Sequence, residues 1–406
     1  MAKHSPIFSR EDVTKLFIVL CFFSFFAVFA LYQYGYVSKP LSLITYNLRP
    51  IARTRANGTN INRTAASRYF MPVLMFLKSG PQHNYIRFRD ALPLVALQNR
   101  TLVAYPIRNH KTQDNASEAR NLSVTFDIEL LKQFVPVVTP YEFFRQCNGS
   151  AVVMNQRIRS KRGNLLKEIY RDTGLLFQEI KHNKENSAAK STFARRLSSL
   201  WEYPCIIYQP RSTPYYNFTL QWKKTAKEAY RYLKKAPYLR SMGEEGARHI
   251  CEGKKYLALH WRNRSGEWCT SGRKQFCNFT RLNLVSESPQ LVKAFQNFMK
   301  LKNISCVYLA FPPFAKKMYD ILRPHIPQLY TKEDLIKTVP SIAAYKNDNF
   351  VISLVEQEIV KRADKFIGCS QSAWTQFAKF ERADMNRRTM SLRAVKGMPK
   401  GVLAIN

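Results

Sequence analysis

Short apolar runs alternate with helix-like segments along most of the chain. Apolar runs of strand formers predict buried strands, and apolar residues spaced three and four apart predict helices. The residues at 79–84, SGPQHN, read as the loop that leaves the first strand. The pattern predicts strands over 68–77, 100–106, 151–158, 256–261, 305–311 and 364–369, and helices over 89–98, 129–144, 219–236, 288–301, 316–325, 353–363 and 372–382.

An alternation of strands and helices along the chain is typical of a doubly wound α/β domain with a parallel sheet. The alternation occurs in two stretches, which predicts one such domain over residues 68–250 and a second over 251–406. A chain of 406 residues that is 46% hydrophobic has enough length and apolar material for two packed cores.

One segment near the N-terminus is far more hydrophobic than the rest. Residues 16–32 read LFIVLCFFSFFAVFALY, where Ser24 is the only polar residue, and a run of this length can just span a bilayer. We interpret it as an uncleaved transmembrane helix, with residues 1–15 as a cytoplasmic tail and 33–67 as a luminal stem. A cleaved signal peptide ending at Ala30 is the alternative.

Sequons and cysteines indicate that the bulk of the chain lies in the secretory lumen. All ten Asn-x-Ser/Thr sequons follow the hydrophobic segment, as do seven of the eight cysteines. Seven is odd, so at least one cysteine is free or pairs between chains, and the pairing stays open. The sequons begin at Asn57, Asn62, Asn99, Asn115, Asn121, Asn148, Asn217, Asn263, Asn278 and Asn303.

We therefore predict a single-pass type II protein of the endoplasmic reticulum or Golgi membrane with its folded part in the lumen. The formal charge of +36 favours anionic partners. A luminal protein does not meet nucleic acid, so nucleic-acid binding is not expected despite this charge. Phosphates, sulfated glycans and membrane surfaces are the anionic partners that this charge leaves open.

Polar residues follow the predicted strand at 256–261. The stretch YLALHWRNRSGEWC brings His260, Arg262 and Glu267 to the strand exit. Ligands of doubly wound sheets bind outside the carboxyl ends of the strands, so this is a candidate site. A strand followed by a solvated loop explains an isolated His-x-Arg equally well, and the rest of the chain has to decide.

Three segments together resemble the protein O-fucosyltransferase family. Residues 352–382, ISLVEQEIVKRADKFIGCSQSAWTQFAKFER, are similar to its C-terminal signature. LALHWRNRSGEW at 257–268 resembles its His-x-Arg loop, and DALPLVALQNRTLVAYP at 90–106 resembles its first helix and second strand. The resemblance implies a GT-B fold, in which two Rossmann-like domains face each other across a cleft. It also implies an inverting enzyme that moves fucose from GDP-fucose to a Ser or Thr hydroxyl of a luminal protein, so the expected partners are this nucleotide sugar and a secreted or membrane glycoprotein acceptor.

The resemblance also implies roles for individual residues. Arg262 matches the catalytic arginine, whose guanidinium suits the charge that gathers on the departing diphosphate. Ser372 is expected at a helix N-terminus that binds phosphate, although plain capping explains it too. Glu356 matches an acidic residue that pairs with guanine, the alternative being an exposed helical glutamate. The implied GDP-fucose site comprises His260, Glu356, Ser372, Trp374, Thr375, Glu267, His83 and Asn84.

The chain departs from the family in the first loop. In place of the family's glycine-rich G-x-x-N-Q motif, this chain has SGPQHNY. His83 and Asn84 align only roughly with the Asn-Gln pair of that motif, and Pro81 precedes them. An inactive relative that binds glycoproteins or acts as a chaperone is therefore one alternative, and a fucosyltransferase acting on glycans is another. No Asp-x-Asp occurs in the sequence. No metal and no cofactor beyond the GDP-fucose donor is expected.

Overall fold

The computed structural model describes residues 68–73, 81–108, 119–155, 162–177, 179–182, 202–209, 220–262, 288–368, 372–394 and 403–405. All of these described residues belong to one compact unit, residues 64–406. The expected tail (1–15), membrane segment (16–32) and stem (33–67) all lie outside the described residues. Among the helices described, none combines the length and the apolar character needed to cross a membrane.

In the described residues the first sheet has six parallel strands, in the order β5-β2-β1-β8-β6-β7. The strand order reverses at β1, as in a doubly wound domain. A separate pair, β3 (Ile107–Arg108) with β4 (Ala119–Arg120), is antiparallel. The strands of the sheet are β1 (Tyr69–Pro72), β2 (Thr101–Val103), β5 (Val137–Val138), β6 (Ser150–Asn155), β7 (Glu179–His182) and β8 (Cys205–Gln209).

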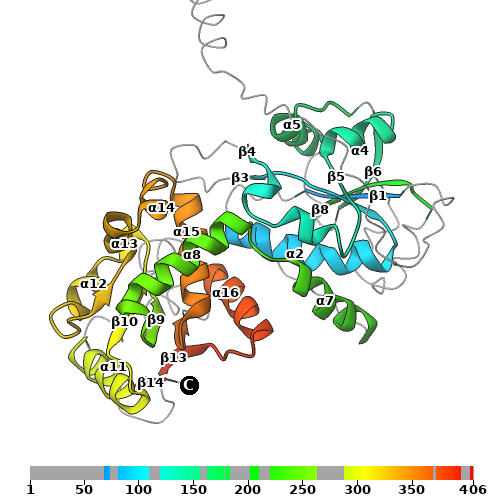
Figure 1. The fold of residues 1–406 in the computed structure, drawn as a ribbon. Helices are drawn as coiled ribbons and strands as arrows, with labels where there is room; N and C mark the ends of the chain where they lie inside the picture. Colours follow the sequence, from blue (N-terminus) through cyan, green and yellow to red (C-terminus); the bar gives the residue numbers. More distant parts are fainter. Residues whose placement is uncertain are drawn as a thin grey trace, which may run out of the picture. The chain divides into compact units, whose positions relative to one another are not determined.

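Helix α2 (Pro81–Leu97) is the longest helix packed on this sheet, and Figure 1 shows it running alongside the strands. It also contacts α7 (Leu220–Tyr232) and α16 (Ala373–Asp384). The shorter helices of this half are α3 (Ile128–Leu131), α4 (Pro140–Gln146) and α5 (Arg162–Thr173).

The second sheet has the order β11-β10-β9-β12-β13-β14, with only the β13–β14 pair antiparallel among its described strands. The strands are β9 (Tyr256–His260), β10 (Cys306–Ala310), β11 (Leu329–Tyr330), β12 (Lys365–Gly368), β13 (Met390–Ala394) and β14 (Leu403–Ile405). The helices are α8 (Pro237–His249), α11 (Ser288–Lys302), α12 (Lys317–Leu322), α13 (Lys332–Thr338), α14 (Pro340–Ala343), α15 (Asn349–Arg362) and α16.

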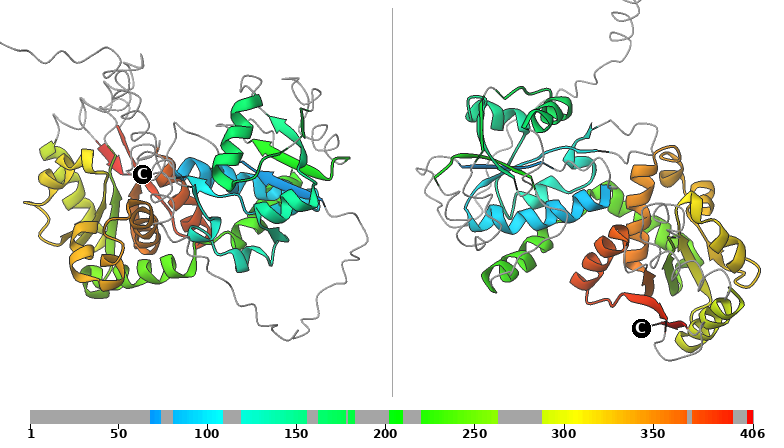
Figure 2. Two further views of the ribbon diagram at one scale, coloured as in Figure 1. Left: turned by 90° about the horizontal axis from the view of Figure 1, so that it is seen from above. Right: turned by 180° about the vertical axis from the view of Figure 1, so that it is seen from behind.

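Alternate residues of β9 pack into two different cores, which is why the whole strand is apolar in sequence. Leu257 and Leu259 join the core with α11 and α12, whereas Tyr256 and Ala258 join the core with α15. Figure 2 shows the α11 and α12 pair and the α15 and α16 pair on opposite faces of the sheet. The doubly wound α/β prediction is confirmed for this half of the chain by the parallel order and by this layering.

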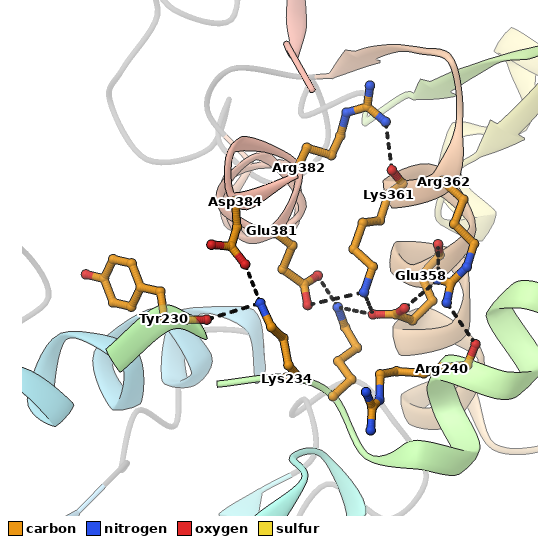
Figure 3. A network of polar contacts seen from close by, with 10 residues as sticks. Tyr230, Lys234, Arg240, Glu358, Lys361, Arg362, Glu381, Arg382 and Asp384 are labelled. Atoms are coloured by element: carbon orange, nitrogen blue, oxygen red, sulfur yellow. Dashed lines mark hydrogen bonds and ion pairs between the residues drawn. The ribbon is translucent and has the colours of Figure 1, made fainter. Parts of the chain in front are cut away.

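A buried charge network joins the segment between α7 and α8 to the helices of the second sheet. We define it as Lys235, Glu358, Lys361, Arg362 and Glu381 (Figure 3). Lys235 Nζ is fully buried and donates to Glu358 Oε1 at 3.2 Å and to Glu381. Burial raises the pKa of Glu358, but Lys235, Lys361 and Arg362 outweigh it and hold that pKa below its usual range.

Two disulfides lie within the described residues. Cys147 at the end of α4 pairs with Cys205 at the start of β8, and Cys251 pairs with Cys306 at the start of β10. Each bond ties a helix end to a strand of its own half of the chain. The sequence had left this pairing open, and Cys269, Cys277 and Cys369 lie outside the described residues.

Several predicted boundaries are wrong, and prolines explain most of them. The segment 79–84 is not all loop, because Pro81 begins α2; the fixed φ of proline suits the first turn of a helix. Pro237 likewise begins α8 instead of only ending the helix before it. The predicted helix over 129–144 is broken into α3, β5 and α4, with Pro140 opening the last. The segment 353–363 mixes apolar and charged residues, which predicts an amphipathic helix, but helix α15 is buried on nearly every side.

Candidate functional site

The second sheet reverses its strand order beside β9. The chain runs from β9 through β10 to β11 on one side and then returns to β12 and β13 on the other side. Ligands of doubly wound sheets bind at the carboxyl ends of the strands at such a reversal. His260 ends β9 and Gly368 ends β12, and the half-buried Arg262 follows His260 by two residues. These residues therefore lie at the edge where a ligand is expected.

His260 is held in place by two residues of α16. Its ring stacks on Trp374 with centroids 4.2 Å apart and ring planes 26° apart. Its Nδ1 lies 2.6 Å from Thr375 Oγ1, a hydrogen-bond distance. His260 is only 6% exposed, so its ring is enclosed by the protein and these contacts orient it. The structure thus brings together three of the predicted site residues from two distant segments of the chain.

Ser372 stands at the N-cap position of α16 but does not cap the helix. Its side chain accepts no backbone N–H of the first turn, so the plain-capping interpretation is wrong. The hydroxyl is fully buried, and Ser372 Oγ has no hydrogen-bond partner among the described residues. A helix of 12 residues directs its first N–H groups and the positive end of its dipole toward this point. The arrangement can bind an anion with both backbone and hydroxyl donors.

Glu356 lies inside the second half of the chain, on α15, and is not an exposed helical glutamate. The Tyr308 hydroxyl, from β10, donates to Glu356 Oε1 at 3.2 Å. The pKa of Glu356 is raised to about 7, chiefly by burial; Glu333 contributes to the rise, whereas Lys332 and the Tyr308 hydrogen bond oppose it. The carboxyl group therefore changes charge near neutral pH. A ligand that donates hydrogen bonds to both of its oxygens needs the ionised form.

The start of α2 reaches the same group of residues. Gln82 Nε2 donates to Ser353 Oγ of α15 at 3.2 Å, and Trp374 Nε1 donates to the same oxygen at 3.0 Å. His83 is exposed, whereas Asn84 is buried, with its Oδ1 hydrogen-bonded to none of the described residues. The two residues predicted as a pair in the first loop thus differ in exposure, and Gln82 is linked to Trp374 through the shared acceptor Ser353 Oγ.

Several residues of this site carried no signal in the sequence. Tyr308 lies in the middle of an apolar strand, and Ser353 is the first residue of the helix predicted over 353–363, a common position for serine. Gln82 directly precedes His83 and Asn84, so the sequence analysis identified the correct segment but not this residue. Glu267 lies in 263–287, outside the described residues. In the part of the chain that the structure describes, no cluster of His, Cys, Asp or Glu could hold a metal ion.

Comparison with known proteins decides which family this site belongs to. Residues 85–385 match the family profile of the GDP-fucose protein O-fucosyltransferases. The chain belongs to this family. The match spans most of the chain and includes His260, Arg262, Glu356 and the start of α16, so the resemblance inferred from three segments is confirmed. A comparison with curated proteins finds no match.

Solved POFUT1 structures share the fold. A crystal structure of POFUT1 in complex with GDP aligns with a TM-score of 0.56 at 16% identity, covering 81% of this chain and 98% of that one. The POFUT1 complex with GDP-fucose aligns with a TM-score of 0.55 at 16% identity, covering 80% and 97%. Fucosyltransferase NodZ from Bradyrhizobium aligns with a TM-score of 0.45 at 13% identity, covering 84% and 99%.

The fold is thus a mixed α/β, GT-B-like fold with parallel sheets. By its family the protein is a GDP-fucose-dependent fucosyltransferase, and GDP-fucose is the donor substrate. The predicted family, enzyme class and donor are confirmed. The roles of the individual residues remain predictions.

Proposed function

We propose that the protein transfers fucose from GDP-fucose, with inversion, to a Ser or Thr hydroxyl of a luminal protein. The N-terminus of α16 carries this proposal. Its buried Ser372 hydroxyl bonds to none of the described residues, and the same turn supplies the Trp374 and Thr375 side chains that contact His260. Diphosphate oxygens accept hydrogen bonds and never donate them at neutral pH, so a cluster of donors suits them.

Each group in this proposal has one task. The α16 terminus and Ser372 hold the diphosphate, and His260 lies against it. The acceptor oxygen forms a bond to the anomeric carbon while the bond from that carbon to the diphosphate breaks. The electron pair of the broken bond goes to GDP, and the acceptor hydroxyl loses its proton to a base. Arg262 stabilises the charge that grows on the leaving oxygen.

Two further parts of the proposal concern shape and location. We propose that the two sheets face each other across the donor cleft, and that the folded part is luminal and anchored by residues 16–32. Two disulfides support an oxidising compartment. The four sequon asparagines within the described residues, Asn99, Asn121, Asn148 and Asn303, are all exposed, which supports glycosylation.

The experiment that tests the function uses the full-length protein in detergent. We expect it to bind GDP and GDP-fucose but not UDP in calorimetry, and to transfer labelled fucose to a folded protein acceptor. A protein that binds neither GDP nor GDP-fucose would be the inactive relative. Label that glycosidases release from the acceptor together with its N-glycans would instead show that the acceptor is a glycan.

The affinity for GDP-fucose should rise with pH through neutrality. If Glu356 accepts N1–H and N2–H of guanine, only its carboxylate form binds the base with both oxygens. The pKa of Glu356 in the free protein is about 7, so a bound guanine must displace its proton at lower pH. We expect the dissociation constant to be about 10-fold larger at pH 6 than at pH 8. The phosphates of GDP-fucose do not titrate in this range, so calorimetry across this range measures the effect directly.

Glu356→Gln is the control for that pH profile. The amide cannot ionise and presents one acceptor, so the variant should bind GDP-fucose more weakly by about 1–3 kcal/mol at pH 8. Its affinity should also be flat between pH 6 and pH 8. A wild-type profile that is equally flat, or a variant that keeps the wild-type slope, contradicts guanine recognition by Glu356.

The luminal location predicts N-glycans at the exposed sequons. Asn99, Asn148 and Asn303 have φ values of 47°, 50° and 51°, a backbone conformation that asparagine tolerates well. Each sequon should therefore be removed at its hydroxyl residue, as in Ser150→Ala, which keeps the asparagine in place. We expect glycosidase treatment to shift the gel mobility of the wild type, and each substitution to remove one step of that shift. An unshifted wild-type band, or a mature N-terminus near Leu31, contradicts the anchored luminal topology.

A further inference from the structure

The contact between His260 and Thr375 depends on the glycine that ends the neighbouring strand. A Cβ added at Gly368 would lie 2.3 Å from Thr375 Cγ2 and 3.1 Å from its Oγ1. Contacts this short force a neighbour to move. The backbone of Gly368 is not in the left-handed region, so it is the space, not the conformation, that calls for glycine here. Gly368 therefore lets Thr375 approach the end of the sheet closely enough to reach His260.

The other side of the imidazole is equally constrained. Trp374 stacks on the ring, and its own position is set by two hydrogen bonds. Its Nε1 donates to Ser353 Oγ at 3.0 Å, and its carbonyl oxygen accepts from Gln357 Nε2 at 3.3 Å. A stacked ring keeps its plane but can still turn over by 180° about its χ2 axis. The Thr375 hydroxyl distinguishes the two orientations, because only one of them brings Nδ1 to it.

We propose that Thr375 is a positioning residue that fixes the orientation and tautomer of His260, so that Nδ1 accepts from the Thr375 hydroxyl and Nε2 carries the proton. The proposal rests on the function proposed above, in which His260 lies against the donor diphosphate. Phosphate oxygens can only accept, so His260 must present an N–H to them. In a neutral imidazole, an N–H at Nε2 leaves Nδ1 without a proton, so Nδ1 can only accept a hydrogen bond. A threonine hydroxyl can supply that hydrogen.

The test compares Thr375→Val with Thr375→Ser in the full-length protein. Valine keeps the shape of the side chain and removes the hydroxyl, whereas serine keeps the hydroxyl and removes the methyl group. With Thr375→Val we expect kcat to fall about 10–100-fold with less than a threefold change in KM for GDP-fucose, because the N–H matters most as charge develops on the diphosphate. Thr375→Ser should recover most of the activity. Thr338→Val, which removes a hydroxyl bonded to the Asp334 carbonyl on α13, should behave as the wild type.

A spectroscopic readout judges the proposal without any activity. The chain has seven histidines, so ¹⁵N-histidine labelling gives few signals, and the His260 signal is the one lost in His260→Gln. We expect the ¹⁵N shifts of the ligand-free wild type to show the Nε2–H tautomer, and those of Thr375→Val to show a mixture. If the wild type neither binds nor turns over GDP-fucose, but the His260 tautomer still differs between the wild type and Thr375→Val, the proposed function is contradicted and the positioning role stands. An unchanged tautomer in Thr375→Val, or equal loss of kcat in the valine and serine variants, overturns the positioning role.

Gly368→Ala gives an independent check. In the wild-type background the added methyl group should push Thr375 away and lower kcat about as much as Thr375→Val does. In a Thr375→Ala background there is no Cγ2 or Oγ1 to displace, so Gly368→Ala should reduce kcat by less than about threefold further. Fully additive losses would mean that Gly368 acts through some other contact and would overturn this part of the argument.

Discussion

Arg262→Ala should lower the kcat of fucose transfer by about 100-fold or more, the scale seen when a preorganised charge-stabilising donor is removed. Charge develops on the leaving oxygen only as the bond to fucose breaks, so Arg262 acts mainly in the transition state. The α16 terminus and Ser372 hold the diphosphate in the ground state, so GDP affinity should change less than kcat. The measurements are transfer rates at saturating donor and calorimetric GDP binding.

Arg262→Lys and Arg145→Ala complete this experiment. Lysine keeps the charge but loses the planar fork of donors, so we expect little recovery of kcat. Arg145 is an exposed residue of α4, and its removal changes the net charge by the same amount without touching the site. Arg145→Ala should leave transfer unchanged. An Arg262→Ala enzyme with normal turnover at saturating donor would remove Arg262 from the mechanism.

Lys235→Met should lower the free energy of unfolding by about 3–5 kcal/mol, the range seen when one partner of a buried ion pair is removed. The ammonium group contacts Glu358 and Glu381 and is fully buried, so the substitution leaves carboxylates in the interior without their partner. Lys361 and Arg362 contact Glu358 as well (Figure 3) and should offset part of the loss. Urea unfolding followed by tryptophan fluorescence and circular dichroism measures the change.

Lys234→Met is the matched control, one residue away. Lys234 pairs with Asp384 in a partly exposed ion pair, and such pairs stabilise proteins by about 0–1 kcal/mol. We therefore expect a small effect from Lys234→Met and a large one from Lys235→Met. Equal effects of the two substitutions would mean that Lys361 and Arg362 neutralise Glu358 and Glu381 without Lys235.

The sequence predicted the strands of the second half well and the first loop poorly. Strand β9 is apolar at nearly every position because its two faces pack into two cores, and that pattern is visible in six consecutive letters. The first turn of α2 looked like a loop because Gly80 and Pro81 are turn formers in most contexts. Proline is also favoured at the first position of a helix, and a local pattern cannot choose between the two.

The sequence alone predicted the fold class, the family resemblance and the placement of His260 and Arg262 at a strand exit. Each of these depends on local periodicity or on a short motif contained within one segment of the chain. The tertiary structure alone decided that Ser372 does not cap its helix, that Glu356 is buried beside Tyr308 and that Thr375 reaches His260 past Gly368. Each of these depends on space or hydrogen bonds between side chains from different segments, and His260 and Thr375 are 115 positions apart. No local pattern records such a contact, because burial and hydrogen-bond partners are set by how the elements pack.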